Sequence, residues 1–116
     1  MPRTVLIADD DPPILDLVGQ VLTAAGYDVC LATDGLDALN QAVSVQPDLV
    51  LTDLMMPNLD GLGLAVRLRA RDQTVPILLM SAVLPPETSP CTGVIRKPFN
   101  IPQLVTAVAD ALDAQA

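Results

Sequence analysis

The sequence predicts an α/β fold in which a parallel β-sheet is covered by helices on both faces. Five short runs of aliphatic and β-branched residues alternate with segments of helical periodicity, which is the order typical of such folds. Several runs are apolar at consecutive positions, as expected for strands that are buried on both faces. The chain has 116 residues, of which 51% are hydrophobic. We therefore predict one domain, residues 1–116, with its own core.

The patterns give five strands and four helices. The strands are expected at Thr4–Ala8, Asp28–Ala32, Leu49–Thr52, Pro76–Ser81 and Gly93–Arg96. The helices are expected at about Pro13–Ala25, Gly35–Val45, Gly61–Arg71 and Pro102–Ala114. Proline suits the first turn of a helix and glycine its end, so Pro13 and Gly26 mark the limits of the first helix. Asp11 and Asp34 are expected as helix N-caps, and Asn100 lies near the start of the last helix.

Each helix carries apolar residues at helical spacing, and these are expected to face the sheet. The predicted inward residues are Ile14, Leu15, Val18, Val21, Leu22 and Ala25 in the first helix; Leu36, Leu39 and Val43 in the second; Leu62, Ala65, Val66 and Leu68 in the third; and Leu104, Val105, Val108 and Leu112 in the last. The arginines Arg67, Arg69 and Arg71 are expected to be exposed to solvent, because alternate positions of a helix do not share one face.

The segment between Ser81 and Val94 departs from this alternation of strands and helices. It contains Pro85, Pro86 and Pro90. Each proline removes a backbone donor and clashes with the preceding helical turn. We therefore predict a loop here, with at most one helical turn.

Composition excludes several classes of function. The net charge of −8 disfavours unaided binding to nucleic acid or to anionic lipid. The absence of histidine excludes histidine metal ligands and histidine general bases. Two cysteines, Cys30 and Cys91, do not make a disulfide framework. With neither a signal-peptide pattern nor an apolar stretch of membrane-spanning length, a cytoplasmic location is expected.

The polar residues that suggest chemistry all lie at the carboxyl ends of predicted strands. Asp9 and Asp10 follow the first strand, Asp53 and Ser81 stand at the ends of the third and fourth, and Lys97 follows the fifth. Ligands of open parallel sheets bind beyond the carboxyl ends of the strands, where the winding reverses. If the first and third strands are neighbours, the three aspartates converge in one cleft. Their mutual repulsion would raise a pKa unless a cation lay among them, and Mg²⁺ is the natural cation for oxygen ligands.

Such a site suits a phosphoryl group. A carboxylate can act as the nucleophile, while the metal ion and Lys97 neutralise charge on the transferred oxygens. These residues lie within longer motifs, which are Ile7-Ala-Asp-Asp-Asp11, Leu51-Thr-Asp-Leu-Met-Met-Pro-Asn-Leu-Asp-Gly61, Ile77-Leu-Leu-Met-Ser-Ala82 and Ile95-Arg-Lys-Pro-Phe99. Together, and in this order, the motifs resemble the response-regulator receiver domain of two-component signal transduction.

The resemblance implies a flavodoxin-like, doubly wound sheet of five strands in the order 2-1-3-4-5. It implies that Asp53 accepts the phosphoryl group from a histidine kinase or phosphotransfer protein. Asp10 would be the direct Mg²⁺ ligand, with Asp9 acting mainly through water. Asp53 and the backbone carbonyl of Met55 would complete the protein's metal contacts. By the same resemblance Ser81 and Lys97 would contact the phosphoryl group, and Lys97-Pro98 would be a cis peptide.

A receiver of this kind is a signalling domain rather than an enzyme. It catalyses only its own phosphorylation and dephosphorylation, and it signals through contacts with a downstream protein. The sequence departs from the family at two places that concern signalling output. The fourth helix of the family is shortened or absent here, and Val94 stands where the family often has Tyr or Phe. Met55 and Val83 are apolar residues expected to flank the attacking water, which predicts slow self-dephosphorylation.

Two other functions remain open from sequence. One is an interaction module with the receiver fold that does not switch on phosphorylation, which the missing helix and Val94 suggest. The other is a Mg²⁺-dependent phosphohydrolase that uses Asp53 as its nucleophile. Phosphohydrolases of the haloacid-dehalogenase type need a second aspartate two residues after the nucleophile. Here that position is Met55, which disfavours this function.

Overall fold

The computed structural model describes residues 2–72, 74–83 and 90–114. In chain order the elements are β1 (Thr4–Ala8), α1 (Pro12–Ala24), β2 (Asp28–Ala32), α2 (Gly35–Val45), β3 (Leu49–Asp53), α3 (Gly61–Arg71), β4 (Ile77–Ser81), β5 (Gly93–Arg96) and α4 (Ile101–Asp113). The predicted bounds agree with these to within one residue at every strand and helix end. The difference that matters for the site is at β3, which is one residue longer than predicted and includes Asp53.

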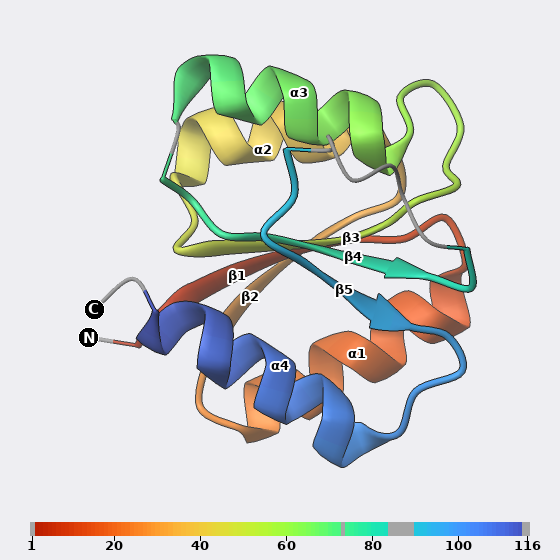
Figure 1. Ribbon diagram of the computed structural model, residues 1–116, viewed down its shortest axis with the longest axis vertical. Coiled ribbons are helices and arrows are strands. Elements are labelled where there is room, and N and C mark those ends of the chain that lie inside the picture. The colour runs from red at the N-terminus through yellow and green to blue at the C-terminus, as the bar shows by residue number, and fades with distance from the viewer. Residues whose placement is uncertain (1, 73, 84–89, 115–116) are drawn as a thin grey trace.

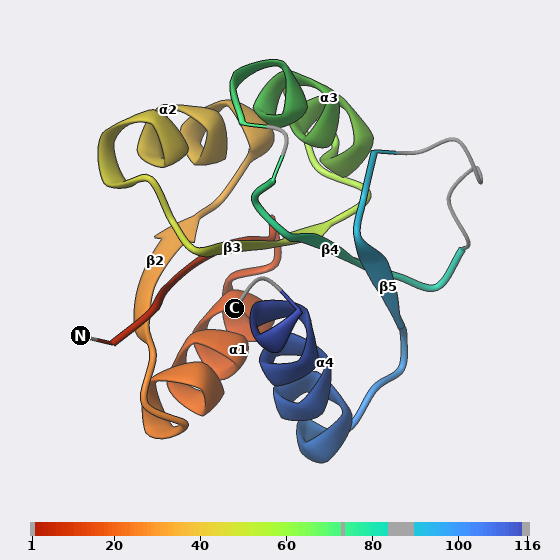
Figure 2. The ribbon, with the colours of Figure 1, turned by 60° about the vertical axis from the view of Figure 1, so that its left-hand side comes forward.

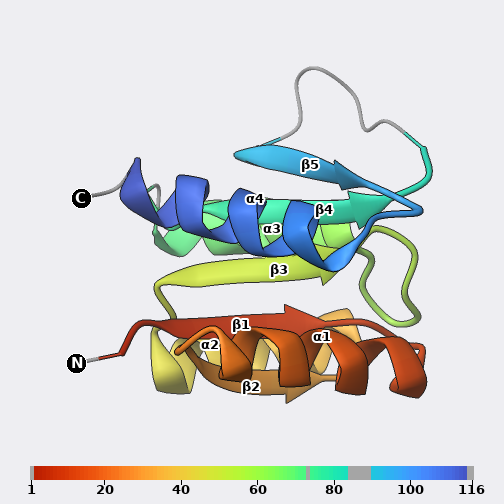
Figure 3. The ribbon, with the colours of Figure 1, turned by 90° about the horizontal axis from the view of Figure 1, so that it is seen from below.

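The five strands form one sheet in the order β2-β1-β3-β4-β5, and every pair is parallel. This confirms the predicted topology. Figure 3 shows the strand arrows pointing to the same side, so all the carboxyl ends lie along one edge of the molecule. The winding reverses between β1 and β3, because the chain moves from β1 outward to β2 and then returns to the far side of β1. The acidic residues that follow β1 and β3 therefore become neighbours.

Helices cover both faces of the sheet, α2 and α3 on one and α1 and α4 on the other (Figures 1 and 2). Each layer has its own apolar core. The core beneath α1 and α4 contains Val18, Leu22, Leu104 and Val108, all of which are almost fully buried. The opposite core is built on Leu64 and small residues such as Ala38. An aliphatic core of this kind was expected from a chain with one tyrosine and one phenylalanine.

The inward face of α2 differs from the prediction. Leu36 and Val43 are each 45% exposed, whereas Ala38 and Ala42 are buried against the sheet together with Gly35. The prediction was therefore wrong for Leu36 and Val43, whereas Leu39, the third predicted inward residue, packs against the core as expected. Small side chains permit a close approach of α2 to the sheet, and hydrophobicity ranked by size does not identify such a face.

A similar error affects α3. Val66 is 59% exposed, while Leu64, Ala65 and Leu68 are buried. Two residues correspond to about 200° of rotation along a helix, so Val66 and Leu64 cannot both face the sheet. Arg69 also contradicts its predicted exposure to solvent. Its guanidinium donates hydrogen bonds to the carbonyl of Pro90 at 3.0 Å and to the hydroxyl of Thr92 at 3.3 Å.

The connection between β4 and β5 contains no helix among its described residues, 82–83 and 90–92. Residues 84–89, on which half of the predicted proline loop falls, lie outside the described residues. The return into β5 is held by backbone and side chain together. The N–H of Thr92 donates to the carbonyl of Ile77 at 2.7 Å, and the N–H of Ile77 donates to the Thr92 hydroxyl at 2.9 Å.

Candidate functional site

Strand pairing fixes the backbone of the residues that follow the strands. The N–H of Asp9, one residue beyond β1, donates to the carbonyl of Ala32 at 3.1 Å. The N–H of Lys97, one residue beyond β5, donates to the carbonyl of Ser81 at 2.9 Å. Asp53 is itself the last residue of β3. The polar side chains are therefore attached to backbone that is fixed by hydrogen bonds of the sheet, and not to an unsupported loop.

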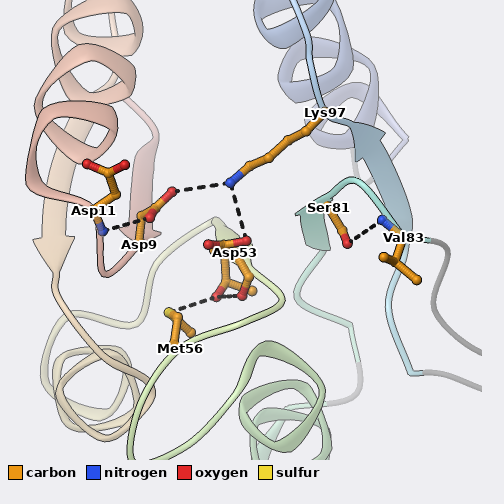
Figure 4. A network of polar contacts seen from close by, with 8 residues as sticks. Asp9, Asp11, Asp53, Met56, Ser81, Val83 and Lys97 are labelled. Atoms are coloured by element: carbon orange, nitrogen blue, oxygen red, sulfur yellow. Dashed lines mark hydrogen bonds and ion pairs between the residues drawn. The ribbon is translucent and has the colours of Figure 1, made fainter.

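The structure brings the three predicted acidic residues together. Asp9, Asp10 and Asp53 each offer a carboxylate oxygen within 4.8 Å of the others. Lys97 lies opposite, with its Nζ atom 3.4 Å from Asp53 Oδ1 and 3.8 Å from Asp9 Oδ2 (Figure 4). Lys97 is the one lysine of the sequence. Its ammonium group thus lies beside a cluster of three carboxyl groups.

Asp9 is the most deeply buried of these carboxylates, with a side-chain exposure of 1%. Its Oδ1 atom accepts a hydrogen bond from the N–H of Asp11 at 2.9 Å. Its Oδ2 atom is buried and has no hydrogen-bond partner among the described residues, because Lys97 is too distant for one. Buried polar atoms normally have a partner, so this oxygen calls for a water molecule or a cation beside it.

Burial raises the pKa of Asp9 above the ordinary carboxyl value, and the nearby charges of Asp53 and Asp10 raise it further. The hydrogen bond from the N–H of Asp11 and the charge of Lys97 oppose this shift. Asp11 itself occupies the N-cap position of α1, but its side chain makes no capping hydrogen bond. The predicted capping by its carboxylate is therefore wrong. Asp11 acts instead through its backbone: its N–H donates to Asp9, and its carbonyl accepts from the N–H of Leu15 at 2.9 Å.

The raised pKa gives a prediction about stability. A group with a raised pKa in the folded state contributes stability below its unfolded pKa, and this contribution is lost as pH rises through the raised value. Without divalent ions, Asp9→Asn should therefore raise the melting temperature at pH 7 by a few degrees. The gain should disappear as pH falls below about 4, where the wild-type carboxyl is protonated too. Thermal unfolding monitored by circular dichroism between pH 3 and pH 8 measures both. A variant that melts below the wild type at pH 7 would contradict the prediction.

Ser81 ends β4 and is 4% exposed. Its Oγ atom accepts a hydrogen bond from the N–H of Val83 at 3.0 Å, a contact drawn in Figure 4. Accepting this bond leaves the hydroxyl proton of Ser81 available for donation. Val83 and Met55, two residues after Ser81 and Asp53 respectively, are large apolar residues that are 67% and 72% exposed.

The segment after Lys97 is fixed to the protein core, and this fixes the backbone that carries the lysine. The Lys97-Pro98 peptide is cis, as expected. Phe99 then packs against the core beneath α1 and α4. Asn100 caps α4 by accepting a hydrogen bond from the N–H of Gln103 at 2.8 Å, and the side chain of Gln103 accepts from the N–H of Asn100. This reciprocal capping fixes where α4 begins and so the path of the chain from β5.

Sequence reasoning missed the contacts that hold the loop between β3 and α3. Asn58 adopts a left-handed backbone conformation with φ of 70°, and its side chain donates to Asp34 at 3.0 Å. Gly35 and Gly61 both lie against backbone carbonyls at distances that leave no room for a side chain. Asparagine and glycine in turns do signal unusual backbone angles, but they do not reveal which distant residue they contact.

The sequence profile described as "Response regulator receiver domain" matches residues 5–109. The chain belongs to this family. It is 40% identical to the DNA-binding dual master transcriptional regulator RpaA of Synechocystis sp., over 93% of this chain and 48% of that protein. It is 35% identical to the DNA-binding response regulator MtrA of Mycolicibacterium smegmatis, over 93% of this chain and 50% of that protein. This receiver thus spans about half the length of these curated relatives.

Solved structures support the same assignment. The chemotaxis response regulator CheY4 of Vibrio cholerae superposes with a TM-score of 0.88 at 29% identity, covering 96% of this receiver and 99% of that chain. A CheY-like receiver domain protein of Methanospirillum hungatei gives a TM-score of 0.93 at 25% identity, covering 99% and 97%. The fold of this receiver is therefore the flavodoxin-like fold expected from its motifs.

Two findings concern the expected absence of membrane and nucleic-acid partners. The helices of the described residues are too short or too polar to cross a membrane. The names of these two relatives describe DNA binding, and this receiver aligns with only about half of each. The absence of nucleic-acid contacts by residues 1–116 is therefore not supported by the relatives. It stays a prediction from the net charge of −8.

Proposed function

We propose that residues 1–116 act as one receiver unit that accepts a phosphoryl group on Asp53 from a sensor histidine kinase or phosphotransfer protein, in a reaction that requires Mg²⁺. The phosphorylated receiver would then signal through a downstream protein. The observation that carries this proposal is the arrangement of charges. One ammonium lies within 4 Å of the carboxylates of Asp9 and Asp53, and a third carboxylate, from Asp10, stands beside them.

The residues present fit a magnesium ion. Three carboxylates offer oxygen atoms within 4.8 Å of one another, and the buried Asp9 Oδ2 atom has no hydrogen-bond partner among the described residues. Asp9, Asp10, Asp53 and the backbone carbonyl of Met55 would hold the ion, with water completing its preferred octahedron. When bound, Mg²⁺ would neutralise negative charge on the oxygens of the transferred group.

The transfer uses Asp53 as the nucleophile. One carboxylate oxygen of Asp53 bonds to phosphorus, and the bond from phosphorus to the donor's imidazole nitrogen breaks. The electron pair of that bond stays on the nitrogen, so atoms and charge balance. Lys97 is close enough to Asp53 to donate a hydrogen bond to the phosphoryl oxygens, and the hydroxyl of Ser81, which accepts its hydrogen bond from Val83, would donate a second. The reaction occurs once per phosphorylation cycle, so the receiver is not an enzyme.

Acetyl phosphate tests the proposal without the cognate kinase. Incubation with acetyl phosphate and Mg²⁺ should add the mass of one phosphoryl group, and the adduct should survive acid and be lost in base. Asp53→Asn should show no gain. Asp60→Asn is a matched control, because asparagine can still accept the capping hydrogen bond that Asp60 accepts from Gly63. Absence of a mass gain in the wild type at saturating acetyl phosphate would contradict the proposal.

The apolar side chains of Met55 and Val83 predict a long-lived phosphorylated state. Neither side chain can orient an attacking water by hydrogen bonding. Replacing both with polar residues, as Met55→Asn with Val83→Glu, should accelerate loss of the phosphoryl group about tenfold, since a positioned general base contributes about 10²-fold or more when fully aligned. Decay of the phosphorylated protein after removal of the donor, followed by mass, measures the change. An unchanged half-life would refute this role for the two residues.

Val94 is the specific observation that favours a second function, an interaction module that does not switch. It lies on β5 opposite Leu79 and has neither a ring nor a hydroxyl to reorient. Beryllofluoride, a phosphoryl mimic, separates the two functions. A switching receiver should show amide chemical-shift changes beyond the acidic cluster when the mimic binds. Changes confined to the site, with unaltered partner affinity, would favour the module.

A further inference from the structure

The loop between β3 and α3, residues 54–60, is held against the start of α2 by two separate contacts. Asn58 Nδ2 donates a hydrogen bond to Asp34 Oδ2 at 3.0 Å. The backbone of Gly35 approaches Leu59 so closely that an added Cβ would lie 1.9 Å from the Leu59 carbonyl oxygen. Neither Asp34 nor Asn58 belongs to the acidic cluster. Their contact joins two segments that are 24 residues apart in sequence.

Asp34 is itself held rigidly by the helix that it caps. Its Oδ1 atom accepts from the N–H of Asp37 at 2.8 Å, which leaves Oδ2 for Asn58. The hydrogen bond from Asp37, and after it the bond from Asn58, lowers the pKa of Asp34. Asp34 therefore stays ionised at neutral pH, and a charged acceptor strengthens its bond with the amide. The start of α2 thus offers a fixed, charged anchor to the loop.

The loop is also constrained internally. Asn58 has φ of 70°, a conformation that asparagine tolerates better than most residues. The N–H of Gly61 donates to the carbonyl of Leu54 at 2.8 Å, and the N–H of Leu59 donates to the carbonyl of Pro57 at 2.7 Å. These bonds define the course of the loop at its end. Between Leu54 and Pro57 the chain carries Met55, whose side chain is 72% exposed.

We propose that Asn58 and Asp34 form a positioning pair that holds the β3–α3 loop in the conformation required for divalent-cation binding at the acidic cluster. The inference rests on the proposed function, in which the backbone carbonyl of Met55 is one of the protein's metal contacts. The position of a backbone carbonyl ligand depends on the conformation of the loop that carries it. Residues that orient metal ligands therefore influence metal affinity strongly. Asn58 and Asp34 thus act through the loop and touch neither the ion nor the phosphoryl group.

Three variants separate the hydrogen bond from the backbone conformation. Asn58→Gly keeps the left-handed conformation but removes the donor. Asn58→Asp also tolerates that conformation but places a second carboxylate against Asp34. Combining Asp34→Asn with Asn58→Asp reverses the pair. Asparagine at position 34 can still cap α2 through its oxygen while its amide donates to the new carboxylate.

The primary readout is the dissociation constant for Mg²⁺ measured by isothermal titration calorimetry, without any phosphodonor. We expect affinity to fall about fivefold in Asn58→Gly, as for loss of one hydrogen bond, and further in Asn58→Asp. The reversed pair should recover wild-type affinity to within about twofold. Hydrogen exchange of the loop amides should accelerate in the two single variants and slow again in the reversed pair. At saturating Mg²⁺ the phosphorylation rate should be unchanged.

Thr74→Ala is a matched control, because it removes an exposed side-chain hydrogen bond, from Thr74 to Asp72 at 2.8 Å, on a loop away from the site. It should leave Mg²⁺ affinity unaltered. Wild-type affinity in both single variants would overturn the positioning role, as would failure of the reversed pair to restore binding in a folded protein. If the wild type itself binds no Mg²⁺, the proposed function fails instead, so the two failures are distinguishable.

Discussion

Lys97→Met should slow phosphorylation of Asp53 by acetyl phosphate by about 10²- to 10³-fold, which is the cost of removing one preorganised charge donor from a transition state. The ammonium lies 3.4 Å from Asp53 Oδ1, and the Lys97 side chain is 31% exposed, so solvent cations replace this group poorly. Mg²⁺ binding should persist and become somewhat tighter, because one positive charge is removed from beside the ion's position. Initial rates followed by mass, together with calorimetric Mg²⁺ titration, measure both effects.

Arg96→Met is the matched control for this substitution. Arg96 immediately precedes Lys97, is exposed, and carries the same charge. Its loss should alter the phosphorylation rate by less than about twofold, since exposed charges at a distance are screened by salt. If Lys97→Met is phosphorylated at the wild-type rate, the ammonium has no part in the transfer. If both variants lose activity equally, net charge rather than position is responsible.

Gly61→Ala should destabilise the receiver by about 3 kcal/mol, since the protein must shift its backbone to admit the methyl group. The added Cβ would lie 2.4 Å from the carbonyl oxygen of Asp53 and 3.0 Å from the Cα atom of Leu54. Both obstacles are backbone atoms next to the proposed phosphoacceptor. The variant should therefore also lose phosphorylation in the fraction that remains folded. Urea unfolding gives the stability, and mass analysis below the transition gives the extent of phosphorylation.

Gly63→Ala tests whether this effect is specific. It lies two residues further along α3, and its nearest obstacle, at 2.6 Å, is the terminal Cδ1 atom of the Leu59 side chain. A terminal methyl group can move at low cost, and alanine is favoured over glycine inside a helix by about 1 kcal/mol. We therefore expect a change within about 1 kcal/mol of zero. A loss as large as that of Gly61→Ala would mean that the close contact with Asp53 is not the cause.

The elements of this fold were predictable because local signals agree with one another. Apolar runs, an early proline in α1 and the capping residue Asp34 place the boundaries of strands and helices almost exactly where the structure has them. The order of the strands came from the resemblance of the motifs to a known family. Local patterns could not predict this order, because the sequence of one strand does not show which other strand it pairs with.

The inward faces of α2 and α3 were harder to predict, for a physical reason. Apolar residues lie on more than one side of each helix, so periodicity alone does not select the buried side. In α2 the buried side is formed by Ala38 and Ala42, whose small size permits close packing, while Leu36 remains 45% exposed. Hydrophobic patterning measures affinity for a core but not the distance at which a helix packs.

The residues of the acidic cluster were predictable from the sequence, but the contacts that hold the surrounding loops were not. Asp9, Asp10, Asp53 and Lys97 lie at the carboxyl ends of strands, so the strand order implied by the family resemblance predicts that they meet. The contact between Asn58 and Asp34 depends on the path of a loop, and that of Arg69 with Pro90 depends on the reach of a long side chain. Such contacts join residues from segments far apart in the sequence, so no residue spacing predicts them.

The most direct test is a crystal structure of the receiver grown with Mg²⁺ and beryllofluoride. It should show beryllium bonded to a carboxylate oxygen of Asp53 and one magnesium ion held by the aspartates of the cluster. Lys97 and Ser81 should both contact the fluorine atoms. A structure in which the mimic leaves Asp53 unmodified, or in which magnesium binds away from Asp9, Asp10 and Asp53, would contradict the account.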